Sequence, residues 1–190
     1  MSIERGATLL AIARGAIARS FGEPAPAYED APWLTELGAS FVTLTRRGEL
    51  RGCIGSLLAE RPLRHDIESN ALAAAFRDPR FPPVAAHEYA DIDVEVSLLS
   101  ALEPIDVKSE TELLSVLRPG VDGVLLEYSS RRGTFLPQVW EQLPEPRAFL
   151  RHLKQKAGLH ADFWAEEIRL SRYTVTKWRE TEHHDTRTVV

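Results

Sequence analysis

This 190-residue chain contains a single cysteine, Cys53. A single cysteine forms neither an internal disulfide nor a thiolate metal cage, so nothing in the sequence indicates an oxidising compartment. The six histidines also lack the paired spacing of a helical zinc site. The sequence therefore predicts no metal site and no disulfide framework.

Long apolar runs and long runs of like-charged residues are missing as well. No stretch approaches the ~20 apolar residues that a membrane-spanning helix needs. The amphipathic segment 1–21 is interrupted by charged side chains and is not predicted to be a secretion signal. A net charge of −5 without a long basic run disfavours nucleic acid as a partner. We therefore expect a cytoplasmic protein that does not enter a membrane.

Common cofactor-binding and nucleophile motifs are also absent. The chain contains no GxxxxGK or GxGxxG phosphate loop and no GxSxG nucleophile elbow. The sequence therefore names no cofactor, and the cofactor stays unknown at this point.

Hydrophobic periodicity predicts helices mixed with β-hairpins rather than a strict βαβ alternation. The expected elements are helices over 2–21, 62–77 and 146–157, a helix after the capping box 109–112, hairpins 41–45/50–55 and 124–128/134–136, and strands over 91–99 and 168–178. This order predicts an α+β fold with a mainly antiparallel sheet and flanking helices. We expect a single domain over 1–180 and a polar C-terminal tail over 181–190.

The stretch Glu49–Ser56 places the lone cysteine between two glycines, in a strand that leaves a tight turn. Side chains alternate along a strand, so Arg51 and Cys53 share a face at a separation of about 7 Å. A guanidinium at that distance interacts with a thiolate by roughly 2 kcal/mol at an effective dielectric of about 20. Gly52 and Gly55 leave room for another backbone or a ligand. Two interpretations stay open, a reactive thiol and a small buried hydrophobe.

Asn70 and Glu95 are further candidate site residues. Asn70 falls on the apolar stripe of the predicted helix 62–77, where it either satisfies backbone groups or lines a site. Glu95 lies on the polar face of the predicted strand 91–99. It is either solvated there or lies beside Arg51 and Cys53, as a base or as an ion-pair partner.

Five stretches carry a distinctive combination of motifs, which are Leu50–Gly55, Asp78–Pro83, Glu95–Ser97, Phe135–Trp140 and Lys156–Leu159. Together they resemble the AMMECR family, called AmmeMemoRadiSam system protein A in bacteria and archaea. The resemblance runs from the first predicted helix to about Trp178, and the motif Leu-Arg-Gly-Cys-Ile-Gly is its most specific part. The usual Gly-Thr ending of that motif is Gly55-Ser56 here, which keeps the hydroxyl group.

The resemblance implies a larger, sheet-containing lobe with a smaller lobe packed on it. The biochemical activity of the family is not settled. Its bacterial name implies an association with Memo-type and radical S-adenosylmethionine (SAM) proteins, which are therefore expected partners in a shared pathway. Carried onto this chain, the main motif falls on Arg51, Gly52, Cys53 and Gly55, and Gln138 lies in the second motif.

These observations support two functional hypotheses. In the first, Cys53 is the centre of a catalytic or small-ligand site, Arg51 orients an anionic group, and Glu95, Asn70 or Gln138 fixes the substrate. In the second, the strand shapes a groove for a peptide or a partner protein, without catalysis. We favour the first hypothesis because the motif places charge, thiol and bare backbone together. Whether the protein is an enzyme stays open, and the ligand is an unidentified small molecule or peptide.

Overall fold

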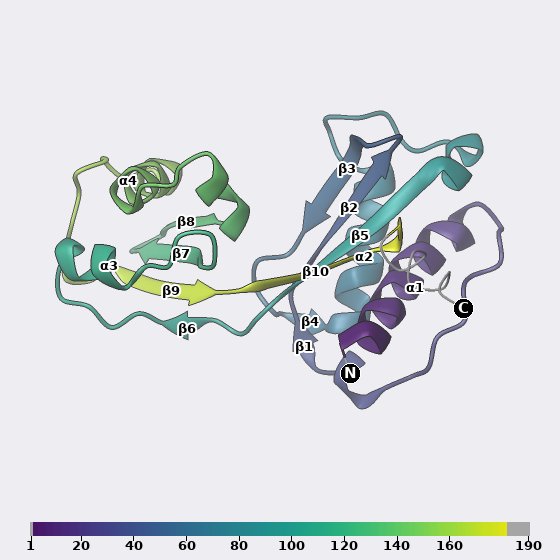
Figure 1. Cartoon of the computed structure of the whole chain (residues 1–190), viewed down its shortest axis with the longest axis horizontal. Coiled ribbons are helices and arrows are strands. Elements are labelled where there is room, and N and C mark those ends of the chain that lie inside the picture. Colours follow the sequence, from purple (N-terminus) through teal and green to yellow (C-terminus); the bar gives the residue numbers. More distant parts are fainter. Residues whose placement is uncertain (1, 182–190) are drawn as a thin grey trace, which may run out of the picture. The chain divides into compact units, whose positions relative to one another are not determined.

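Two separate hydrophobic cores organise the chain, which the computed structural model describes over residues 2–181. The larger unit consists of Met1–Leu99 with Thr176–Val190, and the smaller unit of Ser100–Val175. Both units combine helices with antiparallel strand pairs, which confirms the predicted α+β fold (Figure 1). No helix among the described residues is long and apolar enough to cross a membrane.

A four-stranded sheet in the order β10-β5-β2-β3 forms the frame of the larger unit. Its strands are β2 (Ser40–Arg46), β3 (Glu49–Gly55), β5 (Ile92–Leu99) and β10 (Val175–Arg179). β2 is antiparallel to both β3 and β5. Alternate residues of β2 and β5 are fully buried on one face, as the strand periodicity predicts, and these are Val42, Leu44, Val94 and Val96.

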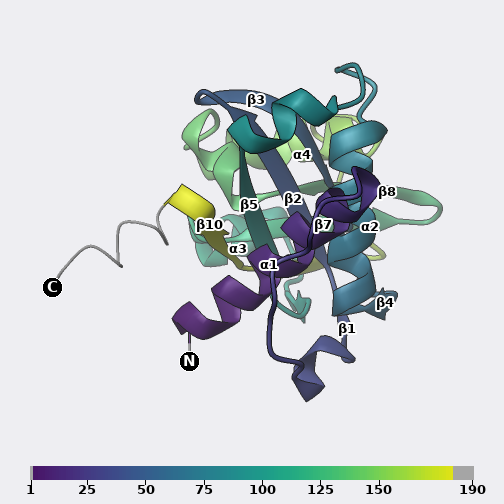
Figure 2. The same cartoon turned by 90° about the vertical axis from the view of Figure 1, so that its right-hand side faces the viewer.

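Helices α1 (Ser2–Ser20) and α2 (Leu63–Phe76) cover this apolar face. Figure 2 shows both helices against the same side of β2 and β5. The stripe of α2 predicted from its spacing is buried, and it consists of Leu63, Ile67, Asn70 and Ala74. The polar residues of the strands therefore lie on the opposite face, which we call the open face.

Short elements complete the larger unit. β1 (Leu37–Gly38) pairs with β4 (Arg61–Pro62), and η1 (Pro32–Leu34) is a short 3-10 helix. A second 3-10 helix, η2 (Ala86–Asp91), leads directly into β5. Between α2 and η2 the chain runs through the proline-rich segment Asp78–Pro83.

The smaller unit has its own four-stranded sheet in the order β6-β9-β7-β8. Its elements are β6 (Glu103–Pro104), α3 (Glu110–Val116), β7 (Gly123–Tyr128), β8 (Arg131–Phe135), η3 (Pro137–Glu141), α4 (Pro146–Lys156) and β9 (Arg169–Tyr173). Ser109 Oγ accepts a hydrogen bond from the N–H of Glu112 at 3.2 Å, as the predicted N-terminal cap of α3 requires. In the core, Trp140 stacks on Phe149 at 3.8 Å between ring centroids.

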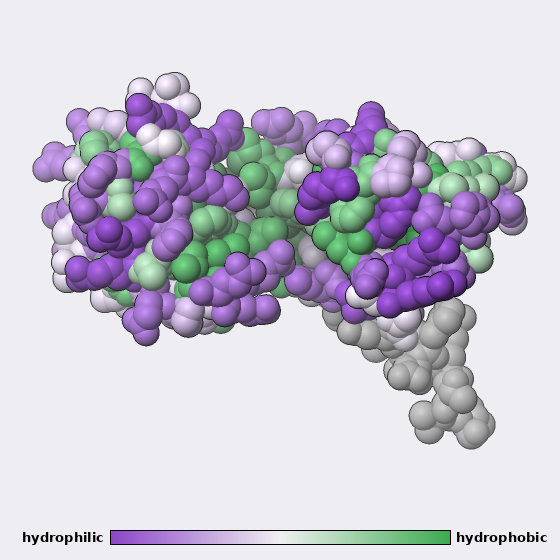
Figure 3. Space-filling view, turned by 90° about the horizontal axis from the view of Figure 1, so that it is seen from above, coloured by the Kyte–Doolittle hydropathy of each residue, from purple (hydrophilic) through white to green (hydrophobic). Residues whose placement is uncertain are grey.

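The exposed side of α4 is basic and polar. Its exposed residues include Arg147, Arg151, His152, Gln155 and Lys156, whereas Phe149, Leu150 and Leu153 are fully buried. In the view of Figure 3, hydrophilic side chains cover most of the surface of the smaller unit. This helix is therefore amphipathic, with its apolar side in the core.

Two expected elements differ from the structure. The single final strand expected over 168–178 is two strands, β9 and β10, which belong to different sheets. The break falls at Thr174, whose N–H donates to Ser100 Oγ at 3.0 Å and whose carbonyl accepts from the N–H of Ser100 at 2.9 Å. The β7–β8 turn is also shorter than expected, because Ser129 adopts a φ of 54° and β8 already begins at Arg131. Of the expected tail 181–190, only Thr181 lies within the described residues.

A buried polar network connects α2 to the start of β2. Asp66 is fully buried and accepts hydrogen bonds from the N–H and Oγ of Ser40, at 2.8 and 2.7 Å. It also accepts from Ser56 Oγ at 2.6 Å, from Arg61 Nε at 2.8 Å and from Asn70 Nδ2 at 3.0 Å. Because each donor needs an acceptor away from water, this carboxylate holds the network together.

Replacing this carboxylate is expected to destabilise the protein. Asp66→Asn keeps the side-chain shape but removes the charge and an acceptor oxygen, so we expect the free energy of unfolding to fall by about 3 kcal/mol. Urea unfolding measures this change. Asp30→Asn is the control, because the Asp30 side chain is 74% exposed and its loss should cost under about 0.5 kcal/mol. Equal stability of the two variants would contradict a central role for Asp66.

Candidate functional site

Cys53 lies on the open face of the larger sheet and is partly exposed. Thr43 of β2 lies opposite Cys53, and Glu95 of β5 lies opposite Thr43, so the three residues form a row across three strands. Thr43 Oγ1 donates a hydrogen bond to Cys53 Sγ at 3.2 Å. The row therefore places a thiol, a hydroxyl and a carboxylate on one surface.

The backbone of Cys53 points away from β2, toward the segment that follows α2. Its N–H donates to Asp78 Oδ2 at 2.9 Å, and its carbonyl accepts from Arg80 Nη2 at 3.2 Å. Opposed residues that exchange no backbone hydrogen bonds have their Cα atoms about 4.5 Å apart and their side chains closest. This arrangement explains why the Thr43 hydroxyl reaches the Cys53 sulfur.

Asp78 and Arg80 form a two-bond ion pair at the outer edge of β3. Arg80 Nε donates to Asp78 Oδ1 at 2.9 Å, and Arg80 Nη2 donates to Asp78 Oδ2 at 2.7 Å. The hydrogen bonds from Arg80, more than those from backbone N–H groups, hold the pKa of the Asp78 carboxyl far below its ordinary value. The same hydrogen bonds raise the pKa of Arg80, and the negative charge of Asp78 acts in the same direction.

Arg51 binds a carboxylate of its own, at Glu88. Its Nε and Nη2 donate to the two Glu88 carboxylate oxygens at 3.1 and 2.9 Å. Nη1 donates to the carbonyl of Pro82 at 2.9 Å, and Nη2 to that of Pro83 at 3.3 Å. The hydrogen bond from Arg51 is the largest cause that lowers the pKa of Glu88 to about 2. Arg51 therefore fastens β3 to the segment that leads into η2.

The two glycines of the motif allow close packing on both faces of β3. A Cβ on Gly52 would lie 2.1 Å from the carbonyl oxygen of Ala74, so α2 packs directly against the strand backbone. A Cβ on Gly55 would lie 2.2 Å from the Phe41 ring. The space beside each glycine is thus filled by the protein itself.

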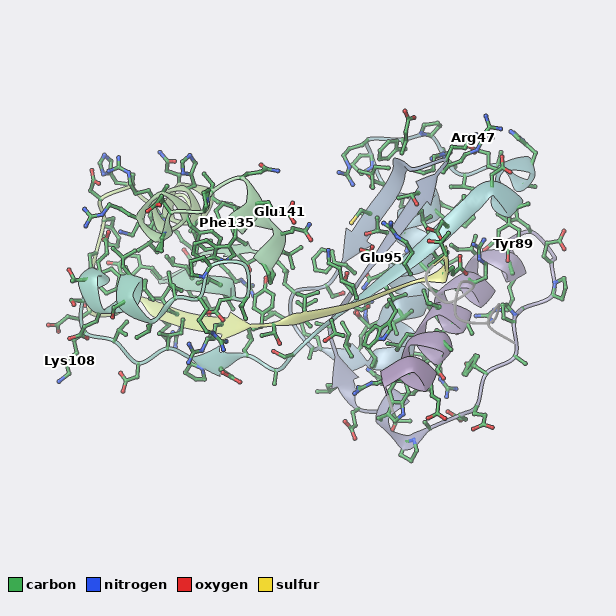
Figure 4. The ribbon with its side chains drawn as sticks, in the orientation of Figure 1. Arg47, Tyr89, Glu95, Lys108, Phe135 and Glu141 are labelled. Atoms are coloured by element: carbon green, nitrogen blue, oxygen red, sulfur yellow. The ribbon has the colours of Figure 1, made fainter. Side chains whose placement is uncertain are left out.

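Glu95 lies at the far end of the row and is paired with cations of β10. Its carboxylate is 3.1 Å from Arg179 Nη2 and 3.9 Å from Lys177 Nζ. The side chain is 16% exposed, and its position on β5 is labelled in Figure 4. Thr43 and Cys53 therefore lie between two ion pairs, Asp78–Arg80 at the β3 edge and Glu95–Arg179 toward β10.

The remaining candidates lie elsewhere in the fold. Asn70 donates to the carbonyl of Ser40 at 2.9 Å and belongs to the buried network around Asp66. Gln138 lies in η3 of the smaller unit. Reasoning from the sequence did not single out Thr43, Asp78, Arg80 or Glu88. Thr43 becomes a candidate only when the cross-strand register places it opposite Cys53. For Asp78 and Arg80, the signal available in the sequence was the presence of charged residues among the prolines of segment 78–83.

Two cavities of the larger unit have walls that do not include this row. One, of about 320 Å³, lies at the β2–β3 hairpin and is lined by Arg46, Arg47, Glu49, Leu50, Arg51 and Glu88. The other, of about 630 Å³, lies between α1, the start of β5 and residues 180–181. Among the described residues, no group of three or more His, Cys, Asp or Glu side chains is arranged to hold a metal ion.

Comparison with known proteins gives consistent matches. The family model AMMECR1 matches residues 10–178. A protein of Methanothermobacter thermautotrophicus is 44% identical over 135 residues, which cover 70% of each chain. A protein of Thermofilum pendens is 38% identical over 179 residues, covering 86% of this chain and 84% of its own. The crystal structure of an uncharacterised protein from Pyrococcus horikoshii superposes with a TM-score of 0.74 at 32% identity, covering 90% of this chain and 89% of that one.

The Arg51–Glu88 pair predicts a defined dependence of stability on pH. Because the pKa of folded Glu88 is lowered from 4.5 to about 2, its ionised form stabilises the fold fully above pH 4.5. That contribution is lost as the pH falls toward 2. Glu88→Gln should therefore show a shallower loss of unfolding free energy on acidification than the wild type. Urea unfolding across this range measures the slope, with the exposed Glu60→Gln as control; parallel wild-type and Glu88→Gln curves would refute the assignment.

The contact at Gly52 predicts a strongly destabilising substitution. In Gly52→Ala the new methyl group overlaps a backbone carbonyl of α2, and we expect a loss of about 3 kcal/mol in unfolding free energy. Gly15→Ala is the matched control, since its Cβ would meet only side-chain atoms, at 3.2 Å or more, and gains helix propensity. Chemical denaturation of both variants measures the difference. A Gly52→Ala protein as stable as the wild type would show that α2 does not pack this closely.

Proposed function

The chain belongs to the AMMECR1 family, and on that premise we propose that it holds a cysteine-centred catalytic or small-ligand site on the open face of its larger sheet. The observation that carries the proposal is the bond of 3.2 Å between Thr43 Oγ1 and a partly exposed Cys53 sulfur. The strand backbone beneath this sulfur is fixed from the side by Asp78 and Arg80. A thiol held in one position, with a polar neighbour and access to solvent, is a suitable nucleophile or ligand-binding group.

The residues of the row have separate roles in this proposal. Cys53 contacts the ligand, and Thr43 orients its sulfur. Two cross-strand steps of about 5 Å each place Glu95 roughly 10 Å from Cys53, so Glu95 acts on the far end of a bound molecule rather than on the thiol itself. Arg51 is a positioning residue, because its donors are engaged by Glu88 and by two carbonyl groups.

The proposed pathway partners are Memo-type and radical SAM proteins. This part of the proposal draws on the family to which the chain belongs. The system name itself comes from the resemblance given under Sequence analysis. Because the chain has one cysteine, the single substitution Cys53→Ser removes its only thiol and tests whether such a partnership needs it.

Alkylation of the single cysteine tests the site. We expect iodoacetamide to modify one group per folded chain at neutral pH, and Cys53→Ser to take up none, as intact-mass measurement will show. Thr43→Val should slow the reaction by about fivefold, because a hydrogen bond of about 1 kcal/mol to the sulfur is lost. A thiol that reacts only in urea would exclude the proposed site.

Partner binding separates this proposal from a non-catalytic peptide-binding module. If Cys53 is the functional group, Cys53→Ser removes pathway output in a protein whose unfolding midpoint is unchanged. A module would instead keep its output with Cys53→Ser and lose partner binding with Arg51→Ala. The second pattern would refute a cysteine-centred function.

A further inference from the structure

We infer that the ligand of the Cys53 site carries an anionic oxygen group, a carboxylate or a phosphate, and that Arg80 binds it. The inference rests on the proposed function of Cys53 and adds the chemical class of the ligand. Its basis is the side-chain cluster of Arg80, Asp78, Thr43 and Cys53 at the outer edge of β3.

Arg80 is held in a fixed orientation beside the thiol. Asp78, which is 4% exposed, accepts from its Nε and Nη2, and the Cys53 carbonyl accepts a further bond from Nη2. A guanidinium carries five donor hydrogens in a planar fork. The bonds that Arg80 makes within the described part of the chain leave both hydrogens of Nη1 without an acceptor. Because the side chain is 54% exposed, this donor edge is accessible to a ligand.

The other cations around the row are already engaged. Arg51 is 12% exposed and donates to Glu88, Pro82 and Pro83. Arg179 lies against the Glu95 carboxylate, at the opposite end of the row. Arg80 is thus the arginine beside Cys53 that combines an exposed donor edge with a fixed position. A pre-oriented guanidinium is well suited to carboxylate and phosphate oxygens, since little side-chain entropy is lost on binding.

Two alkylating reagents that differ only in charge test this inference at the single cysteine. Iodoacetate is an anion and iodoacetamide is neutral, and both transfer a similar small group to sulfur. We expect the iodoacetate-to-iodoacetamide rate ratio for folded wild-type protein to exceed that of glutathione by about tenfold, as one charge-assisted hydrogen bond allows. Arg80→Gln should return the ratio to the glutathione value. The ratio, rather than either rate alone, is the measurement, because Arg80 also bonds the Cys53 carbonyl and its loss can change the rates with both reagents.

Control variants separate Arg80 from general charge and from folding. Arg77→Gln removes an exposed arginine at the C-terminal end of α2, directly before this segment, and should keep the wild-type ratio. In the single variant Arg80→Gln, the Asp78 carboxylate loses its cation, which can prevent folding. The double variant Asp78→Asn/Arg80→Gln removes that unpaired charge and still offers an acceptor to the Cys53 N–H, so it replaces the single variant in that case. In wild-type protein, phosphate or acetate at constant ionic strength should slow the iodoacetamide reaction. Whichever anion protects at the lower concentration identifies the oxygen group that the site prefers.

The outcomes distinguish this inference from the proposed function. A thiol that reacts with iodoacetamide but shows neither an iodoacetate preference nor protection by phosphate or acetate would overturn the anion site and leave the cysteine site standing. A thiol inert to both reagents until unfolding would overturn both. An unchanged ratio in Arg80→Gln would also refute the role of Arg80.

Discussion

The ionic attachment of β3 to the segment after α2 is the constraint on which the site depends. An edge strand presents N–H and C=O groups that have no neighbouring strand to bond. Here Asp78 and Arg80 bond the outward groups of Cys53, and Arg51 binds Glu88 from the same strand. Each carboxylate is nearly buried, and its pKa is lowered chiefly by its arginine, so both pairs stay ionised at neutral pH. The position of the thiol is therefore set by electrostatics at the strand edge as well as by the sheet.

This attachment explains the composition of the motif Arg51-Gly52-Cys53-Ile54-Gly55. Arg51 anchors the strand, Gly52 admits the α2 backbone, and Ile54 packs against the core. Gly55 lies under the Phe41 ring. Four of the five positions thus serve the architecture, and only Cys53 offers a reactive group to the open face. The segment Asp78–Pro83 belongs to the same unit of structure, because it supplies Asp78, Arg80 and two proline carbonyls to this strand.

Local patterns in the sequence predicted most of the fold, and long-range pairing was beyond them. The spacing of Leu63, Ile67, Asn70 and Ala74 identified the buried stripe of α2 because helical periodicity is a local property. Alternation likewise identified β5. The division of the last strand at Thr174 was missed, since both halves have strand composition and only the Ser100 contact separates them.

The same distinction between local and long-range information applies to the site. Alternation predicts a shared face for Arg51 and Cys53, but the β2–β3 register shifts at Arg51. The partners of both residues come from residues 78–88, after an intervening helix. The charges of Arg51 and Arg80 are equivalent in the sequence. Only the fold shows that Arg51 is paired with Glu88. Arg80 instead donates to the Cys53 carbonyl and keeps an exposed donor edge.

The path of the chain also determines how the open face is completed. Glu95 on β5 is paired with Arg179 of β10, although residues 100–175 separate their strands in the sequence. Closing a flexible loop of that length costs about 4 kcal/mol of entropy. The smaller unit removes much of this cost, because Ser100 and Thr174 at its two ends are hydrogen-bonded to each other. When the smaller unit folds, it brings the start of β10 beside the end of β5. Folding of the inserted unit therefore favours the pairing of β10 with β5, and with it the placement of the cationic partner of Glu95.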